Sequence, residues 1–428
     1  MRCIGRMEKI LDVRIGVILG FALVMISGIY LSGHSYSIIA GAAVKFVMLI
    51  AGFVGCLVIG KPKESLRLTL PIVMMIAIGL SAFATLLIYR GANTAFDPIL
   101  LIGIMVFAYM FTRRIPFTSF ARLFSGLLFG LTCIAIIVWV LNEANVDIPN
   151  YSYVSPSGAT YNTIWICTWM QDSNRFMGPF WESGLYASFA VLAILLETCF
   201  TGRRARRPFV VVLLIGIGLS MSTAGYLLAV LVLYIAFRKD RKISIVWDMA
   251  TLIFVIVGFS YSDQLLQLLY SINPDVFWKM VEGGITTSTR IFSPLACLQV
   301  FSENPITGLG MSLATEQYNM LKPVFNIDSL TSTSAFMLAA FGILGVTYTI
   351  ILACAAYRQK ARFSPMTCIF IFVLLFLIVN KEPHFNLFFT YVVLFYLCKV
   401  DQEQRDYEHP EIPVSKYDSQ ENSMMVGL

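Results

Sequence analysis

Charged residues and histidine are scarce in this chain of 428 residues. Only 13% of the residues are charged, three are histidine, and 58% are hydrophobic. A soluble globular domain carries about 25% charged residues, so this composition excludes an ordinary soluble domain and indicates a membrane protein. The net charge of +6 is spread over many short clusters, which is typical of membrane topology signals. A nucleic-acid partner is therefore not expected.

Motifs for several reaction classes are also missing. The nine cysteines form no C-x-x-C pair, so neither a zinc site nor a disulfide framework is indicated. The chain contains no H-E-x-x-H, no G-x-S-x-G and no Asp-x-Asp pair. A partial phosphate-loop match ends in Gly60-Lys61, but Pro62 stands where Ser or Thr is needed. We therefore expect neither a metal ion nor a cofactor.

Long hydrophobic runs fill most of the chain. A membrane-crossing helix needs about 20 apolar residues, and the pattern predicts about twelve such helices, some of them short. The fold class expected is all-α, a polytopic integral membrane protein. The predicted spans are 15–32, 38–60, 66–89, 98–112, 119–141, 181–201, 208–222, 223–237, 245–262, 331–356, 364–380 and 385–398.

The distribution of Lys and Arg sets the expected topology. Twelve spans place twenty-four of the 31 Lys and Arg residues on the side of the N-terminus. Short cytoplasmic loops of membrane proteins are enriched in these cations. Both termini are therefore predicted to be cytoplasmic. The membrane domain covers 1–400, and the polar tail 401–428 is expected to be disordered.

The apolar run from Pro208 to Phe237 has basic residues at both ends, so it must cross the membrane twice or not at all. Small polar residues at 220–225, including Ser222 and Thr223, supply a break. Each half rises only about 20 Å, which is less than the apolar thickness of a bilayer of about 30 Å. We expect this turn to lie within the membrane and to face a cavity.

Two long external loops are predicted, at 142–180 and 261–330. Loops of this length in a compact protein are usually functional or disordered. In the second loop, Arg290 follows Ser288 and Thr289, which we expect to contact substrate. Ser293 is expected to cap a short helix that has Pro294 in its first turn and stops before Asn304-Pro305. Gly308 and Gly310 then provide a turn that could approach a ligand closely.

Arg175, near the end of the first loop, is followed by a Gly-Pro turn and a helix with Glu182 at its start. An external arginine can bind a phosphate in a bidentate manner, although an interfacial anchor would use the same residue. Glu182 is the first candidate for a general base. A carboxylate favoured by the helix dipole explains it equally well.

Three further residues suggest substrate contacts. Lys45 lies alone within a predicted span, where a cation usually faces a bundle interior or a cavity. Lys381 and His384 belong to a short external turn that could line the same cavity as the arginines. A plain polar loop would explain that turn as well.

Four stretches in order resemble the Wzy-type polysaccharide polymerase and O-antigen ligase superfamily. They cover about 175–346 and read RFMGPFWESGLYASFAVLAILL, SMSTAGYLLAVLVL, STRIFSPLACLQVFSENPITGLGMS and SAFMLAAFGILG. The resemblance implies a multi-pass protein of the bacterial cytoplasmic (inner) membrane. It implies metal-independent glycosyl transfer from an oligosaccharide on undecaprenyl pyrophosphate, with paired external arginines, which match Arg175 and Arg290 here. It also implies a chain-length regulator and a flippase as partners.

The resemblance leaves the branch of the superfamily open. The ligase branch has a histidine before the helix that reads SAFMLAAFGILG, whereas this chain has Thr331-Ser332-Thr333-Ser334 at that place. This difference favours a polymerase that joins repeat units into a surface polysaccharide such as capsule or exopolysaccharide. An O-antigen ligase is the alternative within the class, and a transporter or flippase of lipid-linked oligosaccharide is the alternative from another class.

Overall fold

The computed structural model describes most of the membrane domain. The described residues are 38–59, 69–89, 93–146, 148–154, 160–164, 167–170, 176–180, 182–201, 204–239, 241, 243–261, 268, 271, 287–327 and 329–399. The expected first span 15–32 and the expected disordered tail 401–428 lie outside these residues, as does most of 261–286.

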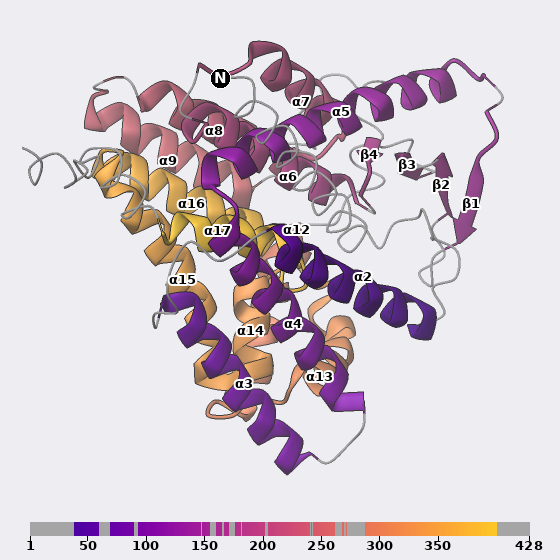
Figure 1. Ribbon diagram of the computed structural model, residues 1–428, viewed down its shortest axis with the longest axis vertical. Helices are drawn as coiled ribbons and strands as arrows, with labels where there is room; N and C mark the ends of the chain where they lie inside the picture. Colours follow the sequence, from indigo (N-terminus) through magenta and orange to yellow (C-terminus); the bar gives the residue numbers. More distant parts are fainter. Residues whose placement is uncertain are drawn as a thin grey trace, which may run out of the picture.

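The described residues form a predominantly helical structure (Figure 1). Each predicted span from 38–60 onward corresponds to a helix or to consecutive helices. The α-helices are α2 Ile38–Ile59, α3 Leu70–Ile88, α4 Asn93–Arg114, α5 Phe117–Glu143, α6 Ser183–Cys199, α7 Arg207–Leu219, α8 Thr223–Arg238, α9 Ile245–Ser260, α12 Thr287–Glu303, α13 Met311–Phe325, α14 Thr333–Phe341, α15 Val346–Tyr357, α16 Pro365–Lys381 and α17 Phe388–Leu397. Short 3₁₀ turns, η1 Gly342–Gly345 and η2 Arg358–Ala361, flank α15.

Four of these segments are long and apolar enough to cross a membrane. They are Leu70–Ile88, Phe96–Arg114, Phe117–Glu143 and Thr333–Ala361. Six further apolar helices have 10 to 17 residues, and helices of that length rise only about 15–26 Å. The structure thus supports a helical membrane protein, whereas the number of twelve spans stays a prediction.

The break in the run 208–237 is confirmed. Helix α7 ends at Leu219, and α8 begins at Thr223 after a turn in which Met221 has a positive φ of 48°. Ser222 caps α8 by accepting a hydrogen bond from the backbone N–H of Gly225 over 3.2 Å. Small polar residues end one helix and cap the next because their side chains satisfy free backbone groups.

The first long loop contains a small antiparallel sheet that we did not predict. Strands β1 Tyr151–Val154, β2 Thr160–Ile164, β3 Cys167–Met170 and β4 Phe176–Gly178 pair in sequence order. Their Tyr, Thr, Val and Ile residues suit a pleated surface. A bulge lies between Thr168 and Trp169. Strand β4 packs against α5 and α6, so the sheet is attached to the helices (Figure 1).

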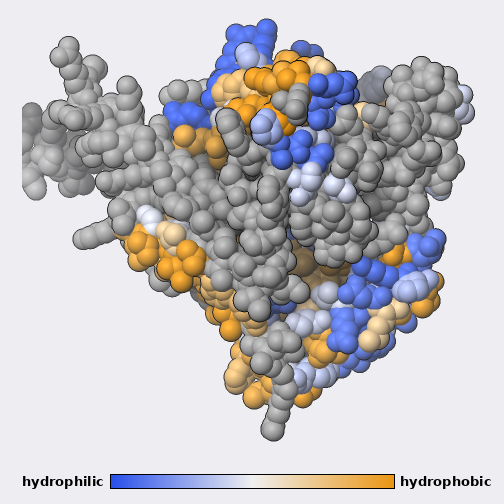
Figure 2. All heavy atoms as spheres, turned by 90° about the vertical axis from the view of Figure 1, so that its right-hand side faces the viewer, coloured by the Kyte–Doolittle hydropathy of each residue, from blue (hydrophilic) through white to orange (hydrophobic). Residues whose placement is uncertain are grey.

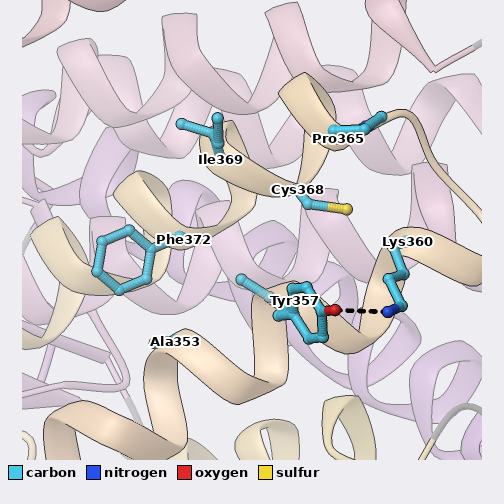
Figure 3. A pocket seen from close by; sticks show the side chains of 8 residues that line it. Ala353, Tyr357, Lys360, Pro365, Cys368, Ile369 and Phe372 are labelled. Carbon is cyan, nitrogen blue, oxygen red and sulfur yellow. Dashed lines mark hydrogen bonds between the residues drawn. The ribbon is translucent and has the colours of Figure 1, made fainter.

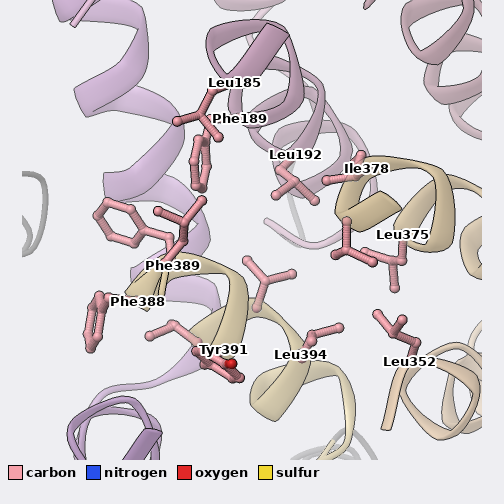
Figure 4. Close-up of a cluster of buried hydrophobic side chains, with 14 of the residues drawn as sticks. Leu185, Phe189, Leu192, Leu352, Leu375, Ile378, Phe388, Phe389, Tyr391 and Leu394 are labelled. Carbon is pink, nitrogen blue, oxygen red and sulfur yellow. The ribbon is translucent and has the colours of Figure 1, made fainter. Parts of the chain in front are cut away.

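The core lies where α6, α16 and α17 meet. Helix α6 is buried along nearly its whole length, and every residue of α17 is buried. Phe189 of α6 contacts Phe389 of α17, with ring centroids 6.1 Å apart, and Leu375 and Ile378 of α16 close the cluster (Figure 4). A helix that is apolar on all sides belongs in the interior of a bundle.

The outer helices expose large hydrophobic side chains to the surroundings. Leu80 and Phe83 of α3 are 60% and 61% exposed, and Ile137 of α5 is 60% exposed. Among the coloured residues of Figure 2, hydrophobic ones form patches near the top and along the lower left, and hydrophilic ones gather at the top and the lower right. Exposed apolar surface of this extent marks contact with a partner or a membrane. With the long apolar helices, it indicates lipid contact.

Candidate functional site

Buried polar groups gather where the first turn of α6, the start of α14 and the end of α16 meet. We call this cluster the polar junction. It consists of Glu182, Ser183, Gly184, Thr331, Ser332, Thr333, Ser334, Asn380, Lys381, Glu382, His384 and Thr390. Most of its side chains are less than 9% exposed. Buried polar groups that are distant in sequence need a structural or functional reason, because each loses its hydration on folding.

Lys381 links α16 to α6. Its Nζ donates a hydrogen bond to the carbonyl oxygen of Gly184 over 3.0 Å, and the side chain is only 2% exposed. The Ser188 hydroxyl donates to the same carbonyl oxygen over 3.0 Å. The turn of Lys381 and His384 therefore lies beside the first turn of α6. That this turn lines one cavity with the arginines stays a prediction.

Glu382 packs over Gly184. A methyl group at Gly184 would clash with the Oε1 atom of Glu382, so only glycine leaves room for this carboxylate. Glu182, two residues earlier, is the N-cap residue of α6 but makes no capping hydrogen bond with its side chain. Two carboxylate residues thus belong to this region, the buried Glu382 packed over Gly184 and the half-buried Glu182 two residues before it in the chain.

Asn380 ties α16 to α14. Its Oδ1 accepts hydrogen bonds from the Ser332 hydroxyl over 2.7 Å and from the backbone N–H of Ser334 over 3.0 Å. Its Nδ2 donates to the Ser334 hydroxyl over 3.1 Å. An amide whose oxygen and nitrogen are both hydrogen-bonded fixes the relative position of two helix ends.

His384 is fully buried in the turn between α16 and α17. Its backbone N–H donates to the Thr333 hydroxyl over 2.7 Å, and its Nδ1 lies 2.9 Å from the Thr390 hydroxyl. Its Nε2 is buried and has no hydrogen-bond partner among the described residues. Burial, reinforced by the charge of Lys381, lowers the pKa of His384 to about 3. The imidazole is neutral at neutral pH and can hydrogen-bond a hydroxyl group.

Helix α12 connects the second long loop to this junction. Ser293 is fully buried, and its hydroxyl accepts hydrogen bonds from the backbone N–H of Thr331 over 3.0 Å and from Tyr318 over 2.9 Å. Arg290 lies one turn before Ser293 in α12. The helix that contains Arg290 is therefore anchored to the residue that precedes α14.

The expected start of this helix was wrong, although its end before Asn304 was right. The helix begins at Thr287, six residues before Ser293, and contains Pro294 in its interior. Ser293 uses its hydroxyl for Thr331 and Tyr318 and not for a cap. Thr289, which we expected to bind substrate, lies within α12 and is fully buried.

The turn expected at Gly308 and Gly310 makes a close contact within the chain. Both residues have positive φ, 71° and 77°, so the predicted turn is present. The Gly310 N–H donates to the carbonyl oxygen of Ala340 over 2.8 Å, and a methyl group at Gly308 would clash with that same oxygen. The close approach is to the end of α14. A ligand contact at these glycines stays a prediction.

Several expected site residues, or their side chains, lie outside the described part of the structure. Arg175 lies outside the described residues, although Phe176 after it is buried against Tyr186, with ring centroids 5.0 Å apart. Lys45, Ser288 and Arg290 lie in helices, but their side chains lie outside the described part of the structure. Ser222 and Thr223, between α7 and α8, are buried and half-buried respectively. Neither forms a hydrogen bond with the polar junction among the described residues.

Sequence reasoning missed Asn380 and gave the hydroxyl run before α14 no role of its own. The usable signals were four consecutive hydroxyl residues, Thr331 to Ser334, at the start of an apolar helix, and an Asn-Lys-Glu run at the end of another. Polar groups at such positions in a membrane protein are hypotheses for function. Within the described residues, no group of three or more His, Cys, Asp and Glu residues could hold a metal ion.

Comparisons with known proteins give no further guidance. No family model, no curated protein and no solved structure matches the chain.

Proposed function

We propose that this protein is a membrane glycosyltransferase of the bacterial cytoplasmic membrane. It polymerises oligosaccharide repeat units that are linked to undecaprenyl pyrophosphate. The observation on which the proposal rests is the polar junction, in which a buried lysine, two glutamates and several hydroxyl groups lie at the ends of apolar helices. A sugar linked to a lipid pyrophosphate has parts that complement these groups. Its lipid chain is apolar like the helices, and its head group is anionic and rich in hydroxyl groups.

The proposed reaction transfers a glycosyl group without a metal ion. An acceptor sugar hydroxyl attacks the anomeric carbon of the donor, the bond from that carbon to the pyrophosphate oxygen breaks, and the hydroxyl proton passes to a carboxylate. Lys381, with Arg290 and Arg175, would stabilise the negative charge that develops on the pyrophosphate. Glu182 or Glu382 would accept the proton, because both adjoin Gly184 in the first turn of α6.

His384 is better suited to binding than to proton transfer. A general base works best when its pKa lies near the working pH, and the pKa of His384 is about 3. Its neutral Nε2 can still hydrogen-bond a sugar hydroxyl. A carboxylate is therefore the stronger candidate for the base.

One observation favours an O-antigen ligase as the second candidate. The chain lacks a histidine in the segment before α14, yet His384 from another turn donates its backbone N–H to Thr333 in that segment over 2.7 Å. The backbone of a histidine thus contacts the segment in which the sequence shows none. The missing histidine is consequently weaker evidence against a ligase than the sequence suggested.

The first experiment compares polymer ladders in cells that lack their own copy of the protein. The variants are Arg175→Ala, Arg290→Ala and Lys381→Met at equal membrane abundance. Arg207→Ala serves as the matched control, because Arg207 is an exposed cation at the start of α7. A polymerase predicts that the three site variants leave single repeat units and that the control keeps long polymer. Full laddering in all three would contradict the proposal.

Analysis of the carrier-linked fraction separates the three candidate functions. Loss of a polymerase leaves undecaprenyl-linked single units on the outer face. Loss of a ligase leaves undecaprenyl-linked long polymer. Loss of a flippase leaves single units on the inner face, where they are protected from an external glycosidase.

A further inference from the structure

An apolar groove lies between α15 and α16, at the end of α16 opposite to the polar junction. It encloses about 360 Å³ and is lined by Ala353, Ala356, Tyr357, Lys360, Pro365, Cys368, Ile369 and Phe372 (Figure 3). Cys368 and Lys381 are thirteen residues apart in α16, which corresponds to about 20 Å along a helix. The groove is therefore separate from the proposed active site.

Small residues create the groove. Ala353 and Ala356 of α15 leave space opposite the side chains of Ile369 and Phe372 of α16 (Figure 3). Its volume lies at the lower end of the range for ligand-binding clefts, about 300–1,000 Å³. Because the lining is almost wholly apolar, the expected occupant is a hydrocarbon chain.

A basic turn follows α15 next to the groove, and its Lys360 is the cation that lines the groove. Turn η2 holds Arg358 and Lys360, and Arg362 follows it, so three cations lie within five residues. Lys360 Nζ donates to the Tyr357 hydroxyl oxygen over 2.6 Å (Figure 3). An ammonium group has three N–H donors, so two remain for an anion, and the Tyr357 O–H can point to the same anion.

The basic turn is held firmly in place. Gln359, between the two cations of η2, is fully buried, and its Nε2 donates to the carbonyl oxygens of Ala355 over 3.1 Å and Leu397 over 2.7 Å. Ser364 caps α16 by accepting a hydrogen bond from the backbone N–H of Thr367 over 3.3 Å. These hydrogen bonds therefore hold the backbone of Lys360 in a fixed position next to the apolar groove.

We propose that this groove binds one anionic phospholipid, with an acyl chain between α15 and α16 and its phosphate on Lys360 and Tyr357. The argument is charge complementarity, since the Lys360 ammonium group at an otherwise apolar groove fits an anionic head group with a hydrocarbon tail. Basic clusters at helix ends bind anionic lipids at the membrane surface. A zwitterionic lipid would place its acyl chain in the same groove but would bind more weakly, because its head group has no net negative charge to attract Lys360.

Native mass spectrometry of the purified full chain in mild detergent tests this proposal. The probes are palmitoyl-oleoyl phosphatidylglycerol and the phosphatidylcholine with the same chains. We expect the wild type to bind phosphatidylglycerol more tightly than phosphatidylcholine. Lys360→Gln should lower that affinity about fivefold and leave the choline lipid unchanged, because one cation near an anionic surface contributes roughly that factor. Ala353→Trp, from an exposed position in the groove, should reduce binding of both lipids.

Two matched variants control for general effects. Arg207→Gln removes an exposed cation from α7, and Ile137→Trp enlarges an exposed apolar side chain on α5. If Arg207→Gln lowers the preference as much as Lys360→Gln, the effect is diffuse charge and the groove site is wrong. Equal affinity of the wild type for the two lipids would also overturn it.

Alkylation of Cys368 gives an independent measurement that needs no variant. This thiol lines the groove, so bound phosphatidylglycerol should slow its reaction with N-ethylmaleimide at lipid concentrations where phosphatidylcholine does not. Peptide mass spectrometry distinguishes Cys368 from the other cysteines. Equal reaction rates in the two lipids would contradict the proposal.

Discussion

Lys381 Nζ and the carbonyl oxygen of Gly184 lie 3.0 Å apart, although the two residues are 197 positions apart in the chain. This contact joins the end of α16 to the first turn of α6. It places a buried ammonium group beside Glu382, whose carboxylate packs over Gly184. The contact therefore brings two segments that are far apart in the sequence together in one candidate site.

A methyl group at Gly184 should impair activity more than stability. In Gly184→Ala the new methyl group would displace the Glu382 carboxylate, which is the end of a flexible side chain and can move at small cost. We expect loss of most polymer, with the unfolding temperature within a few degrees of wild type. Ladder length and thermal unfolding in detergent check the two expectations.

Gly130→Ala is the matched control for this glycine. Gly130 lies in α5, and an added methyl group there meets no atom within 4 Å. Alanine favours a helix over glycine by about 1 kcal/mol, so this variant should be at least as stable as wild type and fully active. A Gly184→Ala protein with normal ladders would show that Glu382 has no role near the reacting groups.

The stability of the protein should fall at acidic pH partly because of His384. The folded state lowers its pKa from 6.5 to about 3, so the unfolded chain binds a proton first as the pH falls. This stabilisation is complete above pH 6.5 and is lost progressively as the pH falls towards 3. Between pH 6.5 and 4.5 the loss amounts to at most about 3 kcal/mol.

Unfolding of wild type and His384→Gln over this pH range measures that contribution. The glutamine has no titrating group, so the difference in unfolding free energy between the two proteins should shrink as the pH decreases. Parallel curves for the two proteins would mean that His384 is not buried as a neutral imidazole.

The helix break before α8 could be predicted from sequence, whereas the polar junction could not. Ser222 acts locally, since its hydroxyl bonds a backbone N–H three residues away, and local signals are present in a single sequence. The bond from Lys381 to Gly184 depends on how two distant helices align along each other. Hydrophobic periodicity indicates which segments are buried but leaves that alignment undetermined.

The start of α12 shows a local signal that tertiary contacts override. Ser293-Pro294 has the composition of a helix start, yet the helix already runs from Thr287. The Ser293 hydroxyl is occupied by Thr331 and Tyr318, which are contacts between elements. Gly308 and Gly310 are a related case. A glycine turn in the sequence indicates that another group can approach the backbone closely, but it does not identify that group, which here includes the carbonyl oxygen of Ala340.

A buried ion pair between α8 and α9 should be essential for stability. Arg238 bonds both carboxylate oxygens of Asp248 over 2.6 Å, and it also donates to the hydroxyls of Ser364 and Thr367. The side chains are 9% and 2% exposed. Removing one partner of such a pair costs about 3–5 kcal/mol, because the other charge stays buried without compensation.

Asp248→Asn should therefore lower the unfolding temperature strongly. The double variant Arg238→Met, Asp248→Leu should recover most of that loss, since an apolar pair of similar size leaves no buried charge. A thermal melt of both proteins in detergent decides the point. If the double variant is no more stable than the single one, hydrogen bonding to Ser364 and Thr367 matters more than the charge.

Gly308→Ala should destabilise the protein without any direct effect on a ligand. Gly308 has a φ of 71°, and a methyl group there would clash with the carbonyl oxygen of Ala340, which is backbone and cannot move aside. A non-glycine residue in this conformation costs about 1–3 kcal/mol even without a clash. Gly218→Ala in α7 meets no atom within 4 Å and should be tolerated. If Gly308 instead bound substrate, Gly308→Ala would keep its stability and lose activity, so unfolding temperature and ladder length together distinguish packing from ligand binding.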